Sequence, residues 1–418
     1  MVSPSNGVGG PEERPLPSQA STAHLPQYGA MNLPETRPAP QLRLRATAVA
    51  AAFLLNGLSF GAWAARIPAV LTQTHLDEAG FGFALLGASL GSVLTMAIGG
   101  WLGGRFGTHK MTPITMVCCG LMLPFIGASW NFVSLVIALL FFGISQGTMD
   151  VCMNANGLAV ERAGTGPIMS RLHATWSIGA FSGALISAQV AAVAIPVLPE
   201  FTVIGAAMVA VGVVLFRAML PDRREAGGGG LRLPTGRLAL LGGLALVGML
   251  AEGSATDWSG VYLRRTLESS EAMAALAVAT FTGSMAFARL FGDKLTIVLG
   301  QGLLVSGGAG LAAAGLGLAL AFQVPALAIV GFGMMGLGLA AVVPTLFRAA
   351  GSQPGIPSSV GIAAVTTMGY GGGLLGPPTI GSIAHEVGLR VSLLIILVLL
   401  AILALSGRRA LATPASSE

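Results

Sequence analysis

Charged residues are scarce in this sequence. Only 9% of its 418 residues are Asp, Glu, Lys or Arg, whereas 54% are hydrophobic. A typical soluble domain has about 25% charged residues, so a soluble chain of this size could not cover its surface with so few. This shortage excludes a cytosolic enzyme and a disordered chain.

Cysteine is also scarce, and basic charge is not gathered into one patch. The three cysteines, Cys118, Cys119 and Cys152, all lie in apolar runs, which excludes a disulfide-rich secreted domain. The net charge is +5, but the basic residues fall in short clusters between apolar runs. This distribution indicates membrane topology and argues against a nucleic-acid partner.

The first residues lack an apolar run of the kind that a signal peptide needs. Eight of the first forty residues are proline. We therefore predict that residues 1–41 form a disordered cytoplasmic tail.

Apolar sequence, in contrast, is abundant and comes in long runs. A membrane-spanning helix needs about 20 mainly apolar residues. Twelve such runs predict an all-α integral membrane protein with twelve transmembrane helices. They lie at roughly 46–71, 82–103, 111–130, 132–160, 168–191, 199–219, 237–263, 272–291, 295–321, 324–348, 357–384 and 388–407.

Basic residues predict the orientation of these spans. With both termini in the cytoplasm, 18 of the 22 Lys and Arg residues lie on the cytoplasmic side. Three lie outside and Arg66 lies within the first span; those outside are Arg264, Arg265 and Arg390. Because cytoplasmic loops carry an excess of Lys and Arg, this bias favours a multi-pass protein of the cell membrane with both ends inside.

One polar, glycine-rich segment, residues 220–236, divides the spans into six and six. We predict a cytoplasmic linker there, an N-terminal six-helix bundle over 42–219, a C-terminal one over 237–407, and a cytoplasmic tail over 408–418. Gly179 and Gly183 precede Gly372 and Gly376 by 193 residues. Residues that recur at a constant offset indicate a duplicated unit, and hence two bundles related by a pseudo-two-fold axis.

Polar residues within the fourth predicted span carry the strongest chemical signal. Gln146, Asp150 and Asn154 recur every four residues, which places them on one helix face. A charge near the bilayer centre costs about 2.5–3.5 kcal/mol, so it usually faces a cavity or a partner. Asp150 is our first candidate for binding and releasing a proton, although a structural tie to a neighbouring helix is the alternative.

The seventh predicted span carries two acids. Glu252, nearer mid-membrane, is a second candidate for proton coupling or substrate binding. Asp257 lies towards the outer end, where we expect it to pair with Arg66 as a static clamp or as a gate. His173, Trp63, Trp176 and Trp258 are weaker candidates: the tryptophans could stack on a sugar ring, but packing is the commoner role of such residues.

Twelve spans, a six-plus-six repeat and a basic central loop resemble the Major Facilitator Superfamily. Its signature after the second span is matched by residues 100–110, with Gly104 in place of the usual Asp, and a second copy keeps Asp293-Lys294. The resemblance implies transport by alternating access and a cytoplasmic latch made by Arg105, Asp293 and Lys294.

Within that superfamily the chain looks most like the fucose-permease-like branch. The likeness lies in residues 146–154, 173–179, 252–258 and 376–381. In the sugar permeases of that branch, an acid four residues before an Asn on the fourth span serves proton coupling and sugar binding. Asp150 and Asn154 occupy those positions, whereas Arg66 stands where those permeases have an acid.

The predicted function is proton-coupled symport of a small organic solute, such as a sugar or a related polar metabolite. Gln146, Asn154, Trp63 and Trp258 are the candidate substrate contacts. Two alternatives remain: efflux of an amphiphilic compound, and a transporter-like sensor without flux. Gly-x-Ser-x-Gly and dinucleotide-like patterns occur, but without the strand that enzymes need before them, so we expect no enzymatic activity. We expect no metal or cofactor and, by analogy, a monomer.

Overall fold

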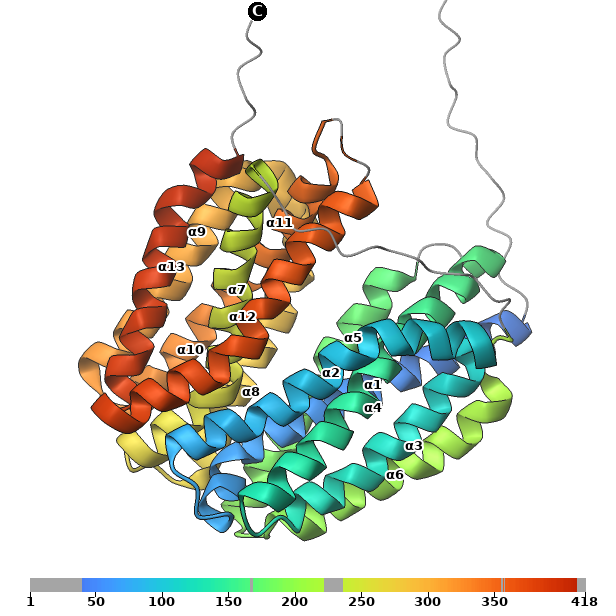
Figure 1. Ribbon diagram of the computed structural model, residues 1–418, viewed down its shortest axis with the longest axis horizontal. Coiled ribbons are helices and arrows are strands. Elements are labelled where there is room, and N and C mark those ends of the chain that lie inside the picture. The colour runs from blue at the N-terminus through green and yellow to red at the C-terminus, as the bar shows by residue number, and fades with distance from the viewer. Residues whose placement is uncertain (1–39, 166–167, 222–235, 355, 357, 412–418) are drawn as a thin grey trace, which may run out of the picture. The chain divides into compact units, whose positions relative to one another are not determined.

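The computed structural model describes residues 40–165, 168–221, 236–354, 356 and 358–411, apart from the side chains of Met96, Ala97, Asp293 and Ser359. These residues form thirteen α-helices within one compact unit (Figure 1). The first six are α1 (Pro40–Gln73), α2 (Glu78–Phe106), α3 (Thr108–Gly127), α4 (Phe132–Val160), α5 (Met169–Ala192) and α6 (Val197–Ala218). The others are α7 (Arg237–Val261), α8 (Glu271–Arg289), α9 (Gly292–Phe322), α10 (Pro325–Leu339), α11 (Val342–Gly351), α12 (Ser358–Val387) and α13 (Leu389–Leu411). Short π-helical turns, η1 (Glu161–Thr165) and η2 (Tyr262–Thr266), extend α4 and α7.

Every predicted span corresponds to helix in this structure. The tenth, expected over 324–348, is divided into α10 and α11. The first helix begins at Pro40 and the last ends at Leu411, so each runs into a predicted tail. The rest of the two tails, and residues 222–235 of the linker, lie outside the described residues.

Ten helical segments are long and apolar enough to cross a membrane among the residues that the structure describes. The two long helices outside that set are α5, which carries Arg171 and His173, and α12, which is rich in glycine and contains Pro377 and Pro378. Both contact helices on two sides, α5 with α1 and α8, and α12 with α7 and α2. Helices that are covered by protein tolerate more polar and small residues than helices that face lipid.

Large apolar side chains project from the peripheral helices. Ile297 of α9 is 83% exposed, Leu405 of α13 is 79% exposed and Val203 of α6 is 71% exposed. Exposed apolar surface of this extent is avoided by soluble monomers but is required of a surface that faces hydrocarbon. The structure therefore supports a multi-pass membrane protein.

Capping side chains define where several helices begin. Asp77 precedes α2 and accepts a hydrogen bond from the Gly80 amide at 2.7 Å. Asn131 and Ser134 form a reciprocal capping box at the start of α4. Ser270 caps α8 by accepting a hydrogen bond from the Met273 amide at 3.3 Å. These caps satisfy amide groups that have no partner inside the helix, so consecutive helices can reverse over short connections.

The helices pack in two groups with the same internal order. In α1–α6 the principal contacts join α1 with α5, α2 with α4, and α3 with α6. In α7–α13 the corresponding contacts join α7 with α12, α8 with α10, and α9 with α13. Between the groups, α5 contacts α8 and α12 contacts α2, which is again a matched pair. This contact order agrees with the repeat that the glycine spacing indicates.

Glycines place these matched helices in the same register. A Cβ atom on Gly179 of α5 would lie 2.1 Å from the carbonyl oxygen of Leu54, and one on Gly372 of α12 would lie 2.6 Å from that of Leu246. One turn later, Gly183 faces Leu58 and Gly376 faces Leu250. The two helix pairs are thus related by offsets of 192–193 residues, and glycine is required at Gly179, Gly183 and Gly372 because the backbones are in contact there.

Replacing Gly179 by alanine should destabilise the protein. The added methyl group would overlap the α1 backbone, and such overpacking typically costs about 1–3 kcal/mol. We expect a lower Tm in detergent, measured by thermal unfolding. Gly371→Ala is the matched control, because a Cβ there has no neighbour within 4 Å. Equal Tm values for the two variants would contradict the predicted contact.

The two ends of the helix bundle differ in their contacts. We call the end where α1 begins and α13 ends the terminal end, and the end that holds connections 74–77 and 268–270 the far end. Among the described residues, two ion pairs join the two helix groups at the far end, Arg66–Glu271 and Arg265–Glu78, and His385 Nδ1 lies 3.2 Å from Asp77 Oδ2 beside them. The candidate site lies between these contacts and the terminal end.

Candidate functional site

Asp150 lies on α4 with its side chain exposed. Its Oδ1 atom accepts a hydrogen bond from Asn154 Nδ2 at 3.1 Å, and the same nitrogen also donates to the Asp150 carbonyl at 2.8 Å. Within the described part of the chain, no Lys or Arg forms an ion pair with it. Tyr370 of α12, in the other helix group, is close enough for a Coulomb interaction with this carboxyl. Asp150 therefore lies within electrostatic range of the opposite helix group, and no described arginine neutralises it.

A hydrogen-bonded chain lies one turn of α4 further towards the far end. Asn56 of α1 donates through Nδ2 to Gln146 Oε1 and accepts through Oδ1 from Trp176 Nε1 of α5 at 2.7 Å. The Cys119 thiol donates to the same Gln146 oxygen at 3.5 Å. Gln146 Nε2 has no acceptor among the residues that the structure describes, so it can donate to a solute.

The other helix group contributes an ion pair. Arg289 Nη2 of α8 lies 3.3 Å from Glu252 Oε1 of α7, and each side chain is about one-third exposed. Across the groups, His173 of α5 lies within the electrostatic range of Arg289 and packs edge-on against Phe53 at a centroid distance of 5.4 Å. Glu252 is thus neutralised by a cation, whereas Asp150 is not.

These residues form what we call the central polar set. It comprises side chains from both helix groups: Asn56, Gln146, Asp150, Asn154, His173, Trp176, Glu252, Arg289 and Tyr370. Sequence reasoning singled out the acids, Gln146 and Asn154, but it missed Asn56, Arg289 and Tyr370. For Asn56 a signal was available, because an amide in the middle of an apolar span needs a partner.

The predicted ion pair between Arg66 and Asp257 is wrong. Arg66 Nε lies 3.1 Å from Glu200 Oε2 of α6, its Nη1 lies 3.3 Å from Glu271 Oε2 of α8, and its Nη2 donates to the Ile195 carbonyl at 2.6 Å. Asp257 has neither an ion pair nor a hydrogen bond with any described side chain. Several carboxylates occur near this level of the bundle, and only the packing of α6 and α8 decides which of them reaches the arginine.

Two of the tryptophans proposed as substrate contacts are buried. Trp63 is 4% exposed and Trp258 is 0% exposed. Trp258 packs edge-on against Phe81 of α2 at a centroid distance of 5.9 Å. Neither side chain lines the central polar set in this conformation. Trp176 is half-buried, with its ring 5.6 Å from that of Phe60 and tilted by 36°, and it is the tryptophan that reaches the set, through its hydrogen bond to Asn56.

The predicted latch residues lie at the terminal end. The Arg105 guanidinium sits over the Trp101 ring at 5.6 Å and over the Phe106 ring at 5.7 Å, and its side chain is exposed. Lys294 of α9 is also exposed. The side chain of Asp293 lies outside the described residues, so the structure leaves the latch as a prediction.

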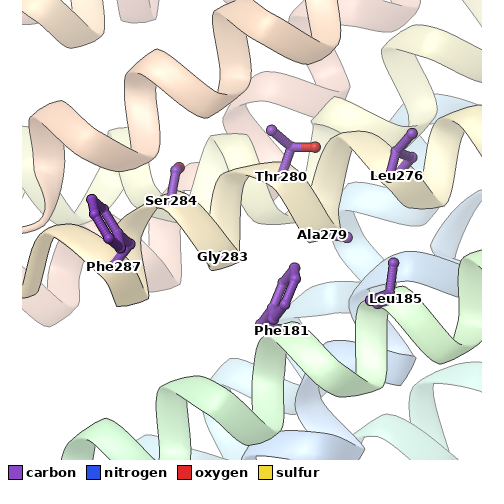
Figure 2. Close-up of a pocket in the computed structure, with 8 residues that line it drawn as sticks. All are labelled: Phe181, Leu185, Leu276, Ala279, Thr280, Gly283, Ser284 and Phe287. Carbon is purple, nitrogen blue, oxygen red and sulfur yellow. The ribbon is translucent and has the colours of Figure 1, made fainter.

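An apolar groove lies between α5 and α8 (Figure 2). In the close-up, Phe181 of α5 points towards α8 beside Gly283, where the absence of a side chain leaves room for its ring. Thr280 and Ser284 are the hydroxyl-bearing residues of its lining. The remaining lining residues are Leu185, Leu276, Ala279 and Phe287.

Comparison with known proteins identifies the family. The Major Facilitator Superfamily profile matches residues 49–353. The chain is 34% identical to an uncharacterised transporter of Sinorhizobium fredii (83% of this chain, 93% of that protein). It is also 34% identical to an uncharacterised MFS-type transporter of Yersinia pestis (85% and 93%) and 33% identical to membrane protein MosC of Rhizobium meliloti (86% and 88%).

Solved structures share the fold at low sequence identity. A bacterial homolog of the human lysosomal transporter Spinster, in an inward-facing and unoccupied conformation, matches with a TM-score of 0.72 and 15% identity, over 90% of this chain and 99% of that one. The nucleoside transporter NupG matches with a TM-score of 0.67 and 14% identity, over 88% and 99%. Profile, relatives and fold agree that the chain belongs to the Major Facilitator Superfamily and is a multi-pass membrane transporter rather than an enzyme.

Proposed function

We propose that this transporter moves a small polar organic solute together with protons. The observation that carries the proposal is the environment of Asp150, namely its exposure and its partners. It is an exposed carboxyl within a membrane-spanning helix, lies within electrostatic range of the other helix group, and has an amide but no cation as partner among the described residues. Such a group can exchange a proton with whichever side of the membrane the site faces, and it can bind solute in the same place.

The hydrogen-bonding capacity of the central polar set favours a hydroxylated solute. Amides, two carboxyls, a guanidinium, an imidazole and a phenol belong to this set, and the half-buried Trp176 ring donates a hydrogen bond to Asn56 within it. Polar groups of this mixed kind suit a sugar or a related metabolite, because both donors and acceptors are present and the tryptophan ring can stack on apolar ring faces. Gln146 and Asn154 would contact the solute, and Glu252 would assist coupling or binding through Arg289.

Assignment of this chain to the fucose-permease-like branch of the superfamily rests on the similarity of short sequence segments alone. The relatives described above have no assigned substrate in their names, so a specific sugar does not follow from them. Asp150 and Asn154 hold the branch's four-residue spacing on α4. Arg66, where sugar permeases have an acid, is committed to Glu200 and Glu271 in this chain. We therefore propose a polar solute without naming it.

Orientation and organisation complete the proposal. The bias of basic residues favours a cytoplasmic terminal end, and the far end would then face outward. Two six-helix bundles, 42–219 and 237–407, would rock about the site as a monomer, with solute and protons entering together. Arg105, Asp293 and Lys294 would close the cytoplasmic side.

Efflux of an amphiphilic compound is the second candidate, and the groove between α5 and α8 is the observation that favours it. The groove is mainly apolar and lies where the two helix groups meet. An amphiphile could approach it laterally from the bilayer, whereas a polar solute could not. A sensor without flux would bind solute but dissipate no gradient.

Proteoliposomes separate these functions. The purified chain, reconstituted with a pH-sensitive dye in the lumen, is tested with a panel of sugars, polyols and nucleosides and, separately, with amphiphilic dyes. Symport predicts that at least one polar solute drives proton entry down the solute gradient. Proton movement driven only by the dyes would support efflux. Binding of a polar solute without any proton or solute flux would support the sensor.

A further inference from the structure

Two acids at the far end occupy equivalent places in the repeat. Glu78 is the first residue of α2 and Glu271 is the first residue of α8, and they are 193 residues apart. The same offset relates Gly179 to Gly372. Glu78 and Glu271 thus begin matched helices in the two groups.

Each acid forms an ion pair with an arginine from the other helix group. Arg265, in the turn η2 that follows α7, lies 2.8 Å from Glu78 and also donates to the Leu76 carbonyl at 2.9 Å. Arg66 of α1 lies 3.3 Å from Glu271. In each ion pair, therefore, an arginine from the first helix of one group, or from the turn that extends it, contacts the first residue of the second helix of the other group. These are α1 with α8, and η2 after α7 with α2.

Separation of either ion pair would leave no buried charge without a counter-ion or water. Arg66 is only 2% exposed, but Glu200, from its own group, stays 3.1 Å away as a second counter-ion. Glu271 is 40% exposed, so water can solvate its carboxylate after separation. Arg265 and Glu78 are 32% and 22% exposed and are also within reach of water. Breaking a fully buried pair would cost much more, and such a contact would act as a permanent clamp.

We propose that Arg265–Glu78 and Arg66–Glu271, whose acids are equivalent in the repeat, form a gate that closes the far end and separates when the transporter opens there. The proposal rests on the alternating access described above. In it, Glu200 is a positioning residue, because it holds Arg66 in place and compensates its charge while Glu271 moves away. His385 and Asp77 lie 3.2 Å apart nearby, and both side chains are half exposed. Their contact is a weaker link between the two helix groups at the far end.

The gate can be tested by measuring distances across the far end. Spin labels at Trp130, in the α3–α4 connection, and at Val324, in the α9–α10 connection, report on the two helix groups, and both positions are exposed. In a cysteine-free version of the full chain, Glu271→Gln and Arg265→Glu should each raise the long-distance population about five-fold, as expected for one ion pair worth about 1 kcal/mol. Glu268→Gln is the matched control, because that exposed acid lies in the same connection as Ser270 and pairs with no described residue.

A charge exchange shows whether the ion pair itself is responsible. Adding Glu78→Arg to Arg265→Glu restores opposite charges and should return the long-distance population towards the wild-type value. If neither single substitution shifts the distances, or if the exchange does not restore them, the gate is wrong. The measurement needs neither solute nor a proton gradient, so a failed coupling assay with an intact gate response counts only against the proposed function.

Discussion

Replacing Asp150 by asparagine is expected to abolish proton-driven accumulation of solute while leaving solute exchange intact. Asparagine keeps the size and hydrogen-bonding capacity of the side chain but cannot bind and release a proton. With 1:1 coupling, a gradient of one pH unit, acid outside, supports about tenfold accumulation, since one unit corresponds to about 1.4 kcal/mol. The variant should stay at equal concentrations inside and outside.

Counterflow provides the measurement that separates coupling from binding. Exchange of labelled for unlabelled solute requires the loaded carrier to reorient but no net proton movement. We expect the exchange rate of Asp150→Asn to remain within about tenfold of wild type, because the change alters one hydrogen-bonding group. Wild-type uptake should rise as the outer pH falls below the inner pH, and the variant should lose this dependence.

The control for this prediction is Glu386→Gln, which neutralises an exposed acid near the end of α12, about four helical turns beyond Tyr370. It should accumulate solute as the wild type does. Should Asp150→Asn accumulate solute normally, another group carries the proton, and Glu252 and Asp257 become the candidates.

Glu200→Leu is expected to be the most destabilising single substitution at the far end. It removes the buried partner of Arg66 and leaves a guanidinium that is 2% exposed with only Glu271 and a backbone carbonyl. Removing one member of a buried pair typically costs about 3–5 kcal/mol when the remaining charge is uncompensated. Because Glu271 still lies 3.3 Å from Arg66, we expect a loss near the lower end of that range. We expect a large fall in Tm in detergent, or loss of folded protein from the membrane fraction.

A double substitution distinguishes charge from packing as the cause. Arg66→Met with Glu200→Leu removes both charges and should recover most of the lost stability, since apolar replacement of a whole buried pair is often neutral. Glu271→Gln alone should cost much less, because that side chain is 40% exposed. If the double variant is as unstable as Glu200→Leu, the hydrogen bond from Ser187 to Glu200 and local packing matter more than the charge.

The fold was largely predictable from sequence, for a physical reason. Membrane-spanning helices satisfy their own backbone hydrogen bonds, so the length of an apolar run and the flanking charges determine each span with little help from distant residues. The fourth span was expected over 132–160 and α4 occupies Phe132–Val160. The offset of 193 residues between glycines likewise anticipated matched helix contacts, because close backbone approach needs glycine in both copies.

Partner choice inside the bundle depended on tertiary structure. The sequence indicated that Asp150, Asn154, Glu252 and Arg66 need partners or a cavity, because intramembrane polar groups are costly. It could not indicate that Arg66 would choose Glu200 and Glu271 over Asp257, or that Glu252 would be neutralised by Arg289. Those choices follow from the rotation and depth of whole helices. A shift of one residue turns a side chain by about 100°, so only the packed structure determines which charges meet.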